Sequence, residues 1–260
     1  NPDPKDDTQM HLLAFDTSTD RMSIAVGRSV DGVEQVWSMA GEGGAQASRT
    51  LLPSILDLLA QADLALAELD AIVFGQGPGA FTGLRTACAV AQGLAFGARA
   101  RTGGMPVPLL PLDSLLVVAE QARQAHAPDA AQWQVLAMLD ARMDEIYAGS
   151  YRWQQPGWQT LQAPALARAQ DLQPPPNCQA LAGNVFAHYG DRLPGGTALA
   201  RIDTLPDARA MLRLAPAMLA AGLAVDPALA LPVYIRDKVA STTQERAAAH
   251  AAASTMAVKP

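Results

Sequence analysis

A glycine-rich segment is the first place in this sequence where residue types and spacing could do chemistry. It spans residues 75–85 (Gly-Gln-Gly-Pro-Gly-Ala-Phe-Thr-Gly-Leu-Arg) and follows an apolar run at 71–74. A strand, a glycine turn and the start of a helix, in that order, can present backbone N–H groups to an anion such as a phosphate. The same glycines can equally be structural, because they permit a tight turn and close helix packing.

Two well-known phosphate-binding motifs fit this segment poorly. Residues 75–80 satisfy the degenerate fingerprint G-x-G-x-x-A of dinucleotide sites, but Pro78 removes an N–H that a pyrophosphate would use. No Asp or Glu occurs between Asp70 and Asp113 to hold a ribose. The sequence contains no Gly-Lys-Ser or Gly-Lys-Thr, which excludes a P-loop. A nicotinamide-dependent oxidoreductase is therefore disfavoured.

Further polar groups lie near this segment or after the first apolar run. Asp16, Thr17, Ser18 and Thr19 could bind a phosphate or a metal-bound water, or could form an Asx turn that closes a hairpin. Arg85 lies near the start of a predicted helix, where a cation is unfavourable to the helix dipole. It could therefore face an anion or a carboxylate of a partner, although solvent exposure explains it equally well.

The sequence offers no recognisable metal or nucleophile motif. No His-x-x-x-His or His-Glu-x-x-His spacing occurs among its four histidines, His11, His126, His188 and His250. A Gly-x-Ser-x-Gly elbow is also absent. The cysteines, Cys88 and Cys178, lie in apolar surroundings and are expected to be small buried residues, not a disulfide framework.

Composition limits the class of protein. The chain has 260 residues, of which 50% are hydrophobic and only 5% aromatic, so a sizeable core of small side chains is expected. A net charge of −6 argues against strong unaided binding to nucleic acid. No apolar stretch can cross a bilayer, and the polar residues 1–10 lack the apolar region of a secretory signal. We expect a cytoplasmic protein with no membrane partner.

The hydrophobic pattern predicts the elements that position these groups. Three apolar runs predict antiparallel strands over 11–15, 22–26 and 33–39. A helix over 47–59, a strand over 71–74 and a helix from about 81 to 97 follow.

Three prolines, at 106, 108 and 111, indicate a boundary between two halves. The second half predicts a helix over 113–124, strands over 134–139, 145–153 and 158–162, a strand end with a short helix near 181–184, and a helix over 207–222. Residues 140–144 would form a charged turn between paired strands. This half weakly echoes the order of elements in the first.

Four segments of the sequence, in this order, resemble those of the bacterial TsaB (YeaZ) family. They are residues 12–19 with 23–26, residues 77–85 with 91–95, residues 139–147 and residues 232–236. The similarity covers roughly residues 11–240. It implies an α/β fold of the actin/Hsp70/sugar-kinase type (ASKHA), built from two ribonuclease-H-like lobes.

The resemblance also implies a function. TsaB-like proteins bind the transferase TsaD, joined by the ATPase TsaE, in the formation of the threonylcarbamoyl group on N6 of the tRNA adenosine next to the anticodon. TsaD carries a His-x-x-x-His metal pair, whereas the corresponding residues 110–116 contain no histidine, and leucine cannot ligate a metal. We therefore expect a non-catalytic scaffold subunit. It would bind no cofactor tightly, with ATP or ADP at most at the interface with TsaD. It would contact tRNA only within the complex and form a homodimer when TsaD is absent.

One alternative interpretation is that the chain is itself an enzyme. Residues 16–19 match the first phosphate-binding turn of the superfold, although the glycine-rich loops of the second lobe are reduced to little more than Gly183 and Asn184. An active metal- or nucleotide-dependent transferase or hydrolase of the same superfold therefore stays open.

The resemblance favours partner binding by the first two helices. Few polar residues are left for a solvated face on the Ala- and Gly-rich helix, which could form a flat patch with the Leu-rich helix before it. The expected contact residues are Leu51, Ile55, Leu84, Arg85, Ala87, Cys88, Ala91 and Leu94. The opposing interpretation is that both helices are internal.

The expected organisation has five parts. They are a disordered leader (1–10), an N-terminal lobe with the partner-binding helices (11–110), a C-terminal lobe (111–206), a returning helix with a C-terminal segment (207–240) and a disordered tail (241–260).

Overall fold

Two five-stranded sheets with the same strand order form the frame of the molecule. The computed structural model describes residues 10–30, 33–44, 46–102, 104–196 and 198–236. The leader and the tail expected from the sequence lie outside these ranges, except that Met10 already begins the first strand.

The first sheet has the order β3-β2-β1-β4-β5. Its strands are β1 (Met10–Asp16), β2 (Arg21–Val30), β3 (Val33–Glu42), β4 (Ala71–Gly77) and β5 (Leu109–Asp113). The first three strands are antiparallel, as predicted, whereas β4 and β5 run parallel to β1. The helices α1 (Ala47–Gln61) and α2 (Phe81–Thr102) occur in the crossovers before and after β4.

The second sheet repeats this topology with the order β8-β7-β6-β9-β10. Its strands are β6 (Gln132–Asp140), β7 (Ile146–Gln154), β8 (Gly157–Ala167), β9 (Ala180–Gly183) and β10 (Ala200–Asp203). Again the first three strands are antiparallel and the last two are parallel to the first. Its crossovers are reduced, and the only α-helix described in them is α4 (Phe186–Tyr189). The two ribonuclease-H-like lobes expected from the sequence are confirmed.

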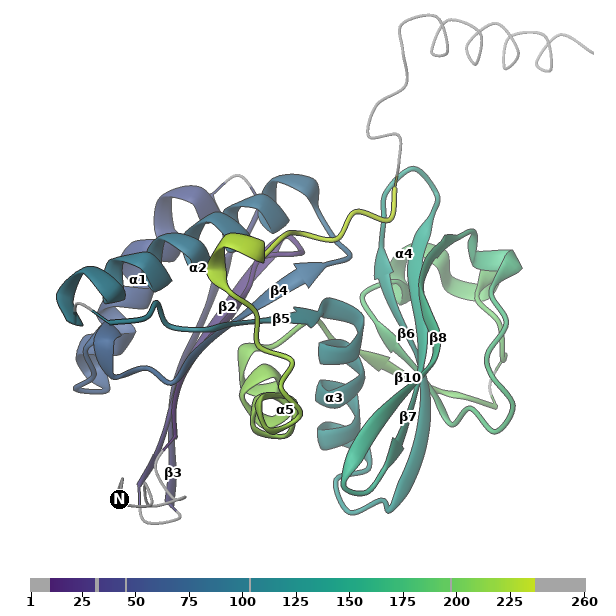
Figure 1. The fold of residues 1–260 in the computed structure, drawn as a ribbon. Coiled ribbons are helices and arrows are strands. Elements are labelled where there is room, and N and C mark those ends of the chain that lie inside the picture. The colour runs from purple at the N-terminus through teal and green to yellow at the C-terminus, as the bar shows by residue number, and fades with distance from the viewer. Residues whose placement is uncertain (1–9, 31–32, 45, 103, 197, 237–260) are drawn as a thin grey trace, which may run out of the picture.

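Each lobe is followed by a helix that packs on the opposite lobe. The helix α3 (Ser114–His126) follows β5 but contacts β6, β7 and β9, and α5 (Ala208–Ala220) follows β10 but contacts β1 and β2. The two helices lie against each other between the sheets (Figure 1). The side chain of Asp113 caps α3 by accepting a hydrogen bond from Leu115 N at 2.9 Å, as expected from the sequence.

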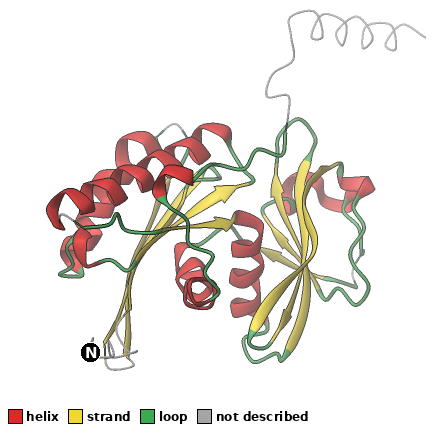
Figure 2. Ribbon diagram, viewed as in Figure 1, coloured by secondary structure: helices red, strands yellow, loops and turns green. Residues whose placement is uncertain are grey.

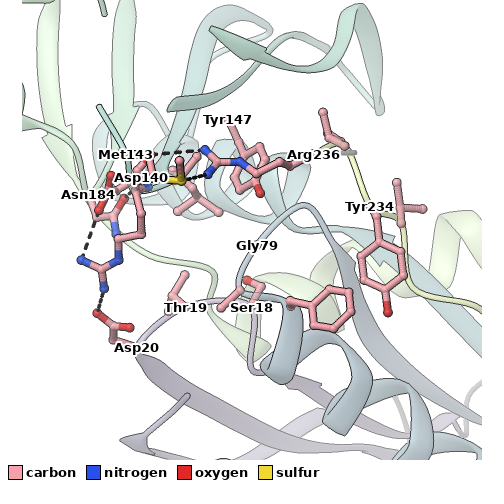
Figure 3. Close-up of a pocket in the computed structure, with 17 residues that line it drawn as sticks. Ser18, Thr19, Asp20, Gly79, Asp140, Met143, Tyr147, Asn184, Tyr234 and Arg236 are labelled. Atoms are coloured by element: carbon pink, nitrogen blue, oxygen red, sulfur yellow. Dashed lines mark hydrogen bonds and ion pairs between the residues drawn. The ribbon is translucent and has the colours of Figure 1, made fainter. Parts of the chain in front are cut away.

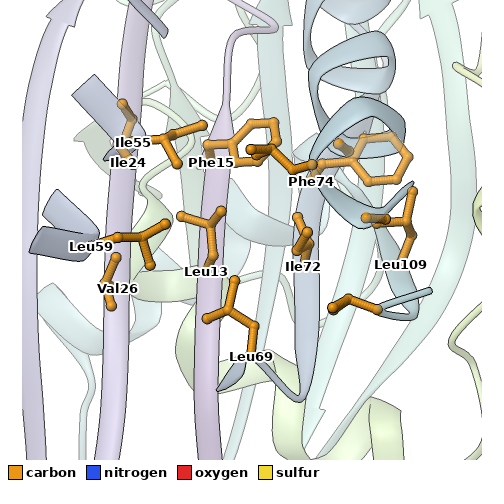
Figure 4. Close-up of a cluster of buried hydrophobic side chains, with 14 of the residues drawn as sticks. Leu13, Phe15, Ile24, Val26, Ile55, Leu59, Leu69, Ile72, Phe74 and Leu109 are labelled. Carbon is orange, nitrogen blue, oxygen red and sulfur yellow. The ribbon is translucent and has the colours of Figure 1, made fainter. Parts of the chain in front are cut away.

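The larger hydrophobic core lies between the first sheet and the helices α1 and α2. Alternate residues of the strands, such as Leu13 and Phe15 on β1, point toward these helices (Figure 4), which cover one face of the sheet (Figure 2). Leu12 and Ala14 belong to the cluster on the other face, with residues of α5. Both faces of the central strands therefore carry apolar side chains, because helices cover each face. Burial of each leucine-sized side chain contributes roughly 1.5–3 kcal/mol to folding.

The predicted boundary at residues 110/111 is displaced in the structure. Pro111 is part of β5, so the first sheet continues to Asp113. This strand tolerates a proline because it lies at the edge of its sheet, where one side needs no ladder hydrogen bond.

A buried carboxylate fixes the two lobes against each other. Glu120 on α3 is 2% exposed and accepts hydrogen bonds from Arg123 at 3.0 Å, Trp158 on β8 at 3.0 Å and Arg213 on α5 at 2.9 Å. These contacts compensate for the desolvation of the charge. Glu120 therefore joins α3, which follows the first lobe, to β8 of the second lobe and to α5, which follows the second lobe.

Replacing Glu120 by alanine should lower the free energy of unfolding by about 3 kcal/mol, because the Arg123 cation would stay buried without the carboxylate that balances its charge. Urea denaturation of purified protein measures this. As a control, Arg192→Ala removes an exposed ion pair with Asp144 and should cost less than about 1 kcal/mol. Equal losses in the two variants would contradict a structural role for Glu120.

Candidate functional site

The glycine-rich segment packs directly on the turn that follows β1. A Cβ added at Gly75 would overlap the carboxylate of Asp16, and one at Gly83 would overlap the carbonyl of Thr17. At Gly79 it would overlap the backbone of Ser18. The glycines are therefore required by the close approach of two backbone segments.

The side chains of this turn are used up in internal hydrogen bonds. Asp16 accepts from Ser18 N at 2.7 Å, from Ser18 Oγ at 2.6 Å and from Ser114 Oγ at 2.9 Å. Thr17 Oγ1 donates to the carbonyl of Gly83 at 2.8 Å. Asp16, Thr17 and Ser18 are buried, and so is Ser114, the first residue of α3. Burial raises the pKa of Asp16, and the hydrogen bonds from Ser18 and Ser114 oppose that rise.

Phosphate binding by Asp16, Thr17 and Ser18 stays a prediction, and the geometry of the turn argues against it. The Ala80 N–H at the start of α2 donates to the Ser18 carbonyl at 2.7 Å, so this donor of the corner is also taken. Of the four candidates only Thr19 is half-exposed, and its hydroxyl bonds to the Arg21 carbonyl at 3.1 Å. The corner therefore works as a structural joint, and its residues do not fit the phosphates of a nucleotide.

A cleft of about 420 Å³ opens beside this joint, between the two lobes (Figure 3). All four segments that carry the family resemblance meet in it. Ser18 and Thr19 come from the first, Gly79–Phe81 from the second, Leu139–Met143 with Tyr147 from the third, and Val233–Arg236 from the fourth. Asn184 also lines the cleft and accepts a hydrogen bond from Asp140 N at 2.9 Å.

The β6–β7 turn on the cleft wall is strained. Arg142, Met143 and Asp144 have φ of 61°, 58° and 61°, a left-handed conformation that costs roughly 1–2 kcal/mol per residue for non-glycine side chains. Arg236 holds this turn by donating to the Arg142 carbonyl at 3.2 Å and to the Glu145 carboxylate at 2.6 Å. The charged turn predicted over 140–144 thus exists, but its contacts with residue 236 are not visible in the local sequence.

The charges of the cleft are mostly paired with each other. Arg142 contacts Asp20 across the cleft at 2.5 Å and Asp140 on its own side at 3.4 Å. Because the Arg142 and Asp20 side chains are 68% and 77% exposed, this bridge between the lobes contributes little to stability. With Arg142 and Arg236 both paired to carboxylates, the described residues of the cleft include no free cation cluster for a phosphate.

The part of the chain that the structure describes holds neither a candidate metal cluster nor a candidate membrane span. Within it, no group of three or more His, Cys, Asp or Glu side chains is placed to hold a metal ion. No helix in the same ranges combines the length and apolarity that a bilayer crossing needs.

Seven of the eight expected partner-contact residues are buried in the chain's own core. They are Leu51, Ile55, Leu84, Ala87, Cys88, Ala91 and Leu94, whereas Arg85 is exposed. The interpretation of these seven as a docking patch is wrong for this conformation, because six of them belong to the core cluster on the first sheet and Leu84 lies against Gly77 of β4.

The outward side of the same two helices is also apolar. We define the α1–α2 face as the exposed residues Leu52, Leu56, Ala89, Gly93 and Phe96. A Cβ at Gly93 would meet nothing within 4 Å, so this helix surface is open. The sequence pattern predicts a helix here, but it does not tell which side of the helix faces the sheet, because α2 carries small apolar residues on most sides.

A C-terminal strap, residues 225–236, runs along α2 beside this face (Figure 1). Gln92 donates to the Pro227 carbonyl at 2.9 Å, and Cys88 Sγ donates to the Ala230 carbonyl at 3.3 Å. Leu229 and Leu231 of the strap are 73% and 70% exposed. The apolar surface therefore has a second component that the sequence did not predict.

Comparisons with known proteins agree with this architecture. A family model described as TsaD, tRNA N6-adenosine threonylcarbamoyltransferase, matches residues 42–259. A tRNA threonylcarbamoyladenosine biosynthesis protein TsaB from Escherichia coli is 30% identical over 246 residues, 89% of this chain and 96% of the relative. This chain belongs to the TsaB (YeaZ) family.

Two other members support the assignment. The TsaB protein of Haemophilus influenzae is 38% identical over 141 residues, which cover 52% of this chain and only 51% of the relative's length. The structure of YeaZ from Pseudomonas aeruginosa superposes with a TM-score of 0.74 at 36% identity, over 86% of this chain and 99% of that one. The family fold expected from the four segments is thus confirmed.

Alanine substitutions should separate packing glycines from surface glycines. Gly83→Ala should lower the free energy of unfolding by about 1–3 kcal/mol, because its Cβ would push against the Thr17 carbonyl. Gly97→Ala, on the open side of α2, should raise it by roughly 0.5–1 kcal/mol through helix propensity. Urea denaturation tests both. Stabilisation by Gly83→Ala would show that this glycine is not needed for packing.

Proposed function

We propose that this chain is a non-catalytic scaffold subunit that binds TsaD, together with TsaE. It would serve formation of the threonylcarbamoyl group on N6 of the tRNA adenosine next to the anticodon. The names of its relatives and its membership of the family support a role in this modification. The closed joint at Asp16 supports a scaffold over an active nucleotide-dependent enzyme, because the carboxylate of Asp16 and the hydroxyl of Thr17 are buried and already bonded to groups of the chain itself.

The single observation that carries the docking role is the exposed apolar surface made by the α1–α2 face and the strap. Large exposed apolar patches on a folded protein mark interaction sites more often than chance. Leu229 and Leu231 are long side chains that project from a strap tied to α2 at its backbone. A docked partner would bury apolar side-chain area that is now exposed to solvent, and this burial would favour binding.

The open surface of α2 favours a helix as the occupant. Ala89 and Gly93 carry almost no side chain and lie one turn apart, so a partner helix could approach α2 closely. TsaD is expected to present matching helices because the family model that describes it also matches this chain. A second copy of this chain would use the same surface when TsaD is absent, in an isologous dimer.

The remaining expectations follow from this assignment and stay part of the proposal. ATP or ADP of the assembly would lie at the interface with TsaD, since the 16–19 turn does not fit its phosphates. Contact with tRNA would occur only within the complex, in keeping with the acidic net charge. The assembly would work in the cytoplasm.

Ala89→Arg should weaken binding to TsaD at least about 100-fold, because an unpaired buried charge costs about 3 kcal/mol or more. Ala89 is exposed, so this variant should unfold at the same urea concentration as the unchanged chain. Calorimetric titration of TsaD from the same organism into each purified variant gives the affinities.

The matched control is Ala163→Arg, an exposed alanine on β8 of the second lobe, which should bind TsaD normally. Arginine at Ala87 or Ala91 is uninformative, since both are buried and the core itself would be disrupted. Full affinity of Ala89→Arg would contradict docking through the α1–α2 face.

A further inference from the structure

Arg85 is held in one orientation by two aromatic residues. Its guanidinium carbon lies 3.8 Å from the ring centre of Phe81, one turn earlier on α2. Its Nε donates a hydrogen bond to the hydroxyl of Tyr234 on the strap at 2.9 Å. The Phe81 and Tyr234 rings are themselves 4.9 Å apart, at the rim of the cleft (Figure 3). The flat face and the Nε edge of the guanidinium are therefore both occupied.

The outer edge of the same guanidinium is free to bind. Arg85 is exposed, and among the described residues no carboxylate lies within ion-pair distance of it. The only hydrogen bond described for it uses Nε, which leaves the two terminal nitrogens to donate outward. A guanidinium fixed in this way loses little conformational entropy when it binds a planar acceptor with two parallel hydrogen bonds.

Arg85 also lies on the docking surface. Ala89 follows it by four residues and Phe96 by eleven, so the three share one side of α2. Arg85 is the fifth residue of α2, and the helix dipole disfavours a cation this close to the N-terminus of the helix, a cost that a neighbouring negative charge would relieve.

We propose that Arg85 is a preformed anchor that takes a carboxylate, from an Asp or Glu side chain of the protein docked on α2. The inference rests on the proposed function, since it names a contact within that interface. Arginine and aromatic residues together are typical of the energetic centres of protein interfaces.

A protein carboxylate fits this place better than a nucleic-acid phosphate. Arg85 is the only Lys or Arg in the sequence between Arg49 and Arg99, and its neighbours on the face are Ala, Gly and Phe. Binding to a phosphate backbone depends on several cations acting together. A single oriented guanidinium beside an apolar surface instead matches one acidic side chain within a protein interface.

The test is titration of purified TsaD into the unchanged chain, the Ala89→Arg variant and four further variants of the full chain, at 50 and 300 mM salt. Arg85→Ala should weaken binding roughly 10- to 100-fold and reduce its salt dependence. Arg85→Lys keeps the charge but loses the two-pronged geometry, so its loss should be intermediate. Tyr234→Phe removes the hydroxyl that orients the guanidinium and should produce a smaller loss. Arg168→Ala, an exposed arginine after β8, should bind normally.

The possible results distinguish failure of the Arg85 anchor from failure of the proposed docking face. If Ala89→Arg abolishes binding but Arg85→Ala binds like the unchanged chain, the anchor is refuted and the proposed docking face stands. If the unchanged chain does not bind TsaD, both ideas fail. If Arg85→Ala leaves the TsaD affinity intact but weakens tRNA binding by the assembled complex, Arg85 contacts phosphate and the carboxylate inference is wrong. Circular dichroism of every variant confirms that the fold is kept.

Discussion

The buried carboxylate of Asp16 is the constraint on which the rest of the structure depends. It lies at the end of β1 and accepts hydrogen bonds from Ser18 and from Ser114 at the start of α3. A buried charge with satisfied acceptors can persist, whereas the loss of these donors would leave an expensive group inside the protein. To reach them, the turn must press against the glycine-rich segment, which explains why a side chain at Gly75 or Gly83 has no room. One carboxylate thus joins the first sheet to the helix that packs on the second.

This constraint has a consequence for function. The corner where related phosphate-binding folds would offer free N–H groups and hydroxyls is filled by the chain's own atoms, such as the Ser18 carbonyl bonded to Ala80 N. The second lobe has short crossovers, and its cleft-facing arginines, Arg142 and Arg236, are paired with acids. On the outside of the first lobe, by contrast, α2 and the strap leave apolar side chains and one oriented guanidinium exposed.

Local patterns in the sequence were enough for most of the fold. Periodicity placed α1, α3 and the β6–β7 hairpin, because each buries one regular face. The four-residue β10 was missed, since so short an edge strand shows no period. The site was harder to predict. The sequence favours Leu51 and Ala87 as contact residues although both are buried, because a helix apolar on most sides does not reveal which side meets its own sheet. The contact between Arg85 and Tyr234 joins residues 149 positions apart, and no local pattern encodes it.

Hydrogen–deuterium exchange of this chain, alone and with TsaD, tests the central claim most directly. Bound TsaD should slow amide exchange in α2 and in the strap, residues 225–236, while β8 of the second lobe should exchange as before. Local opening of a helix covered by a partner becomes rarer, so protection should rise there first. Protection confined to β8 or to the β6–β7 turn, with α2 and the strap unchanged, would contradict it.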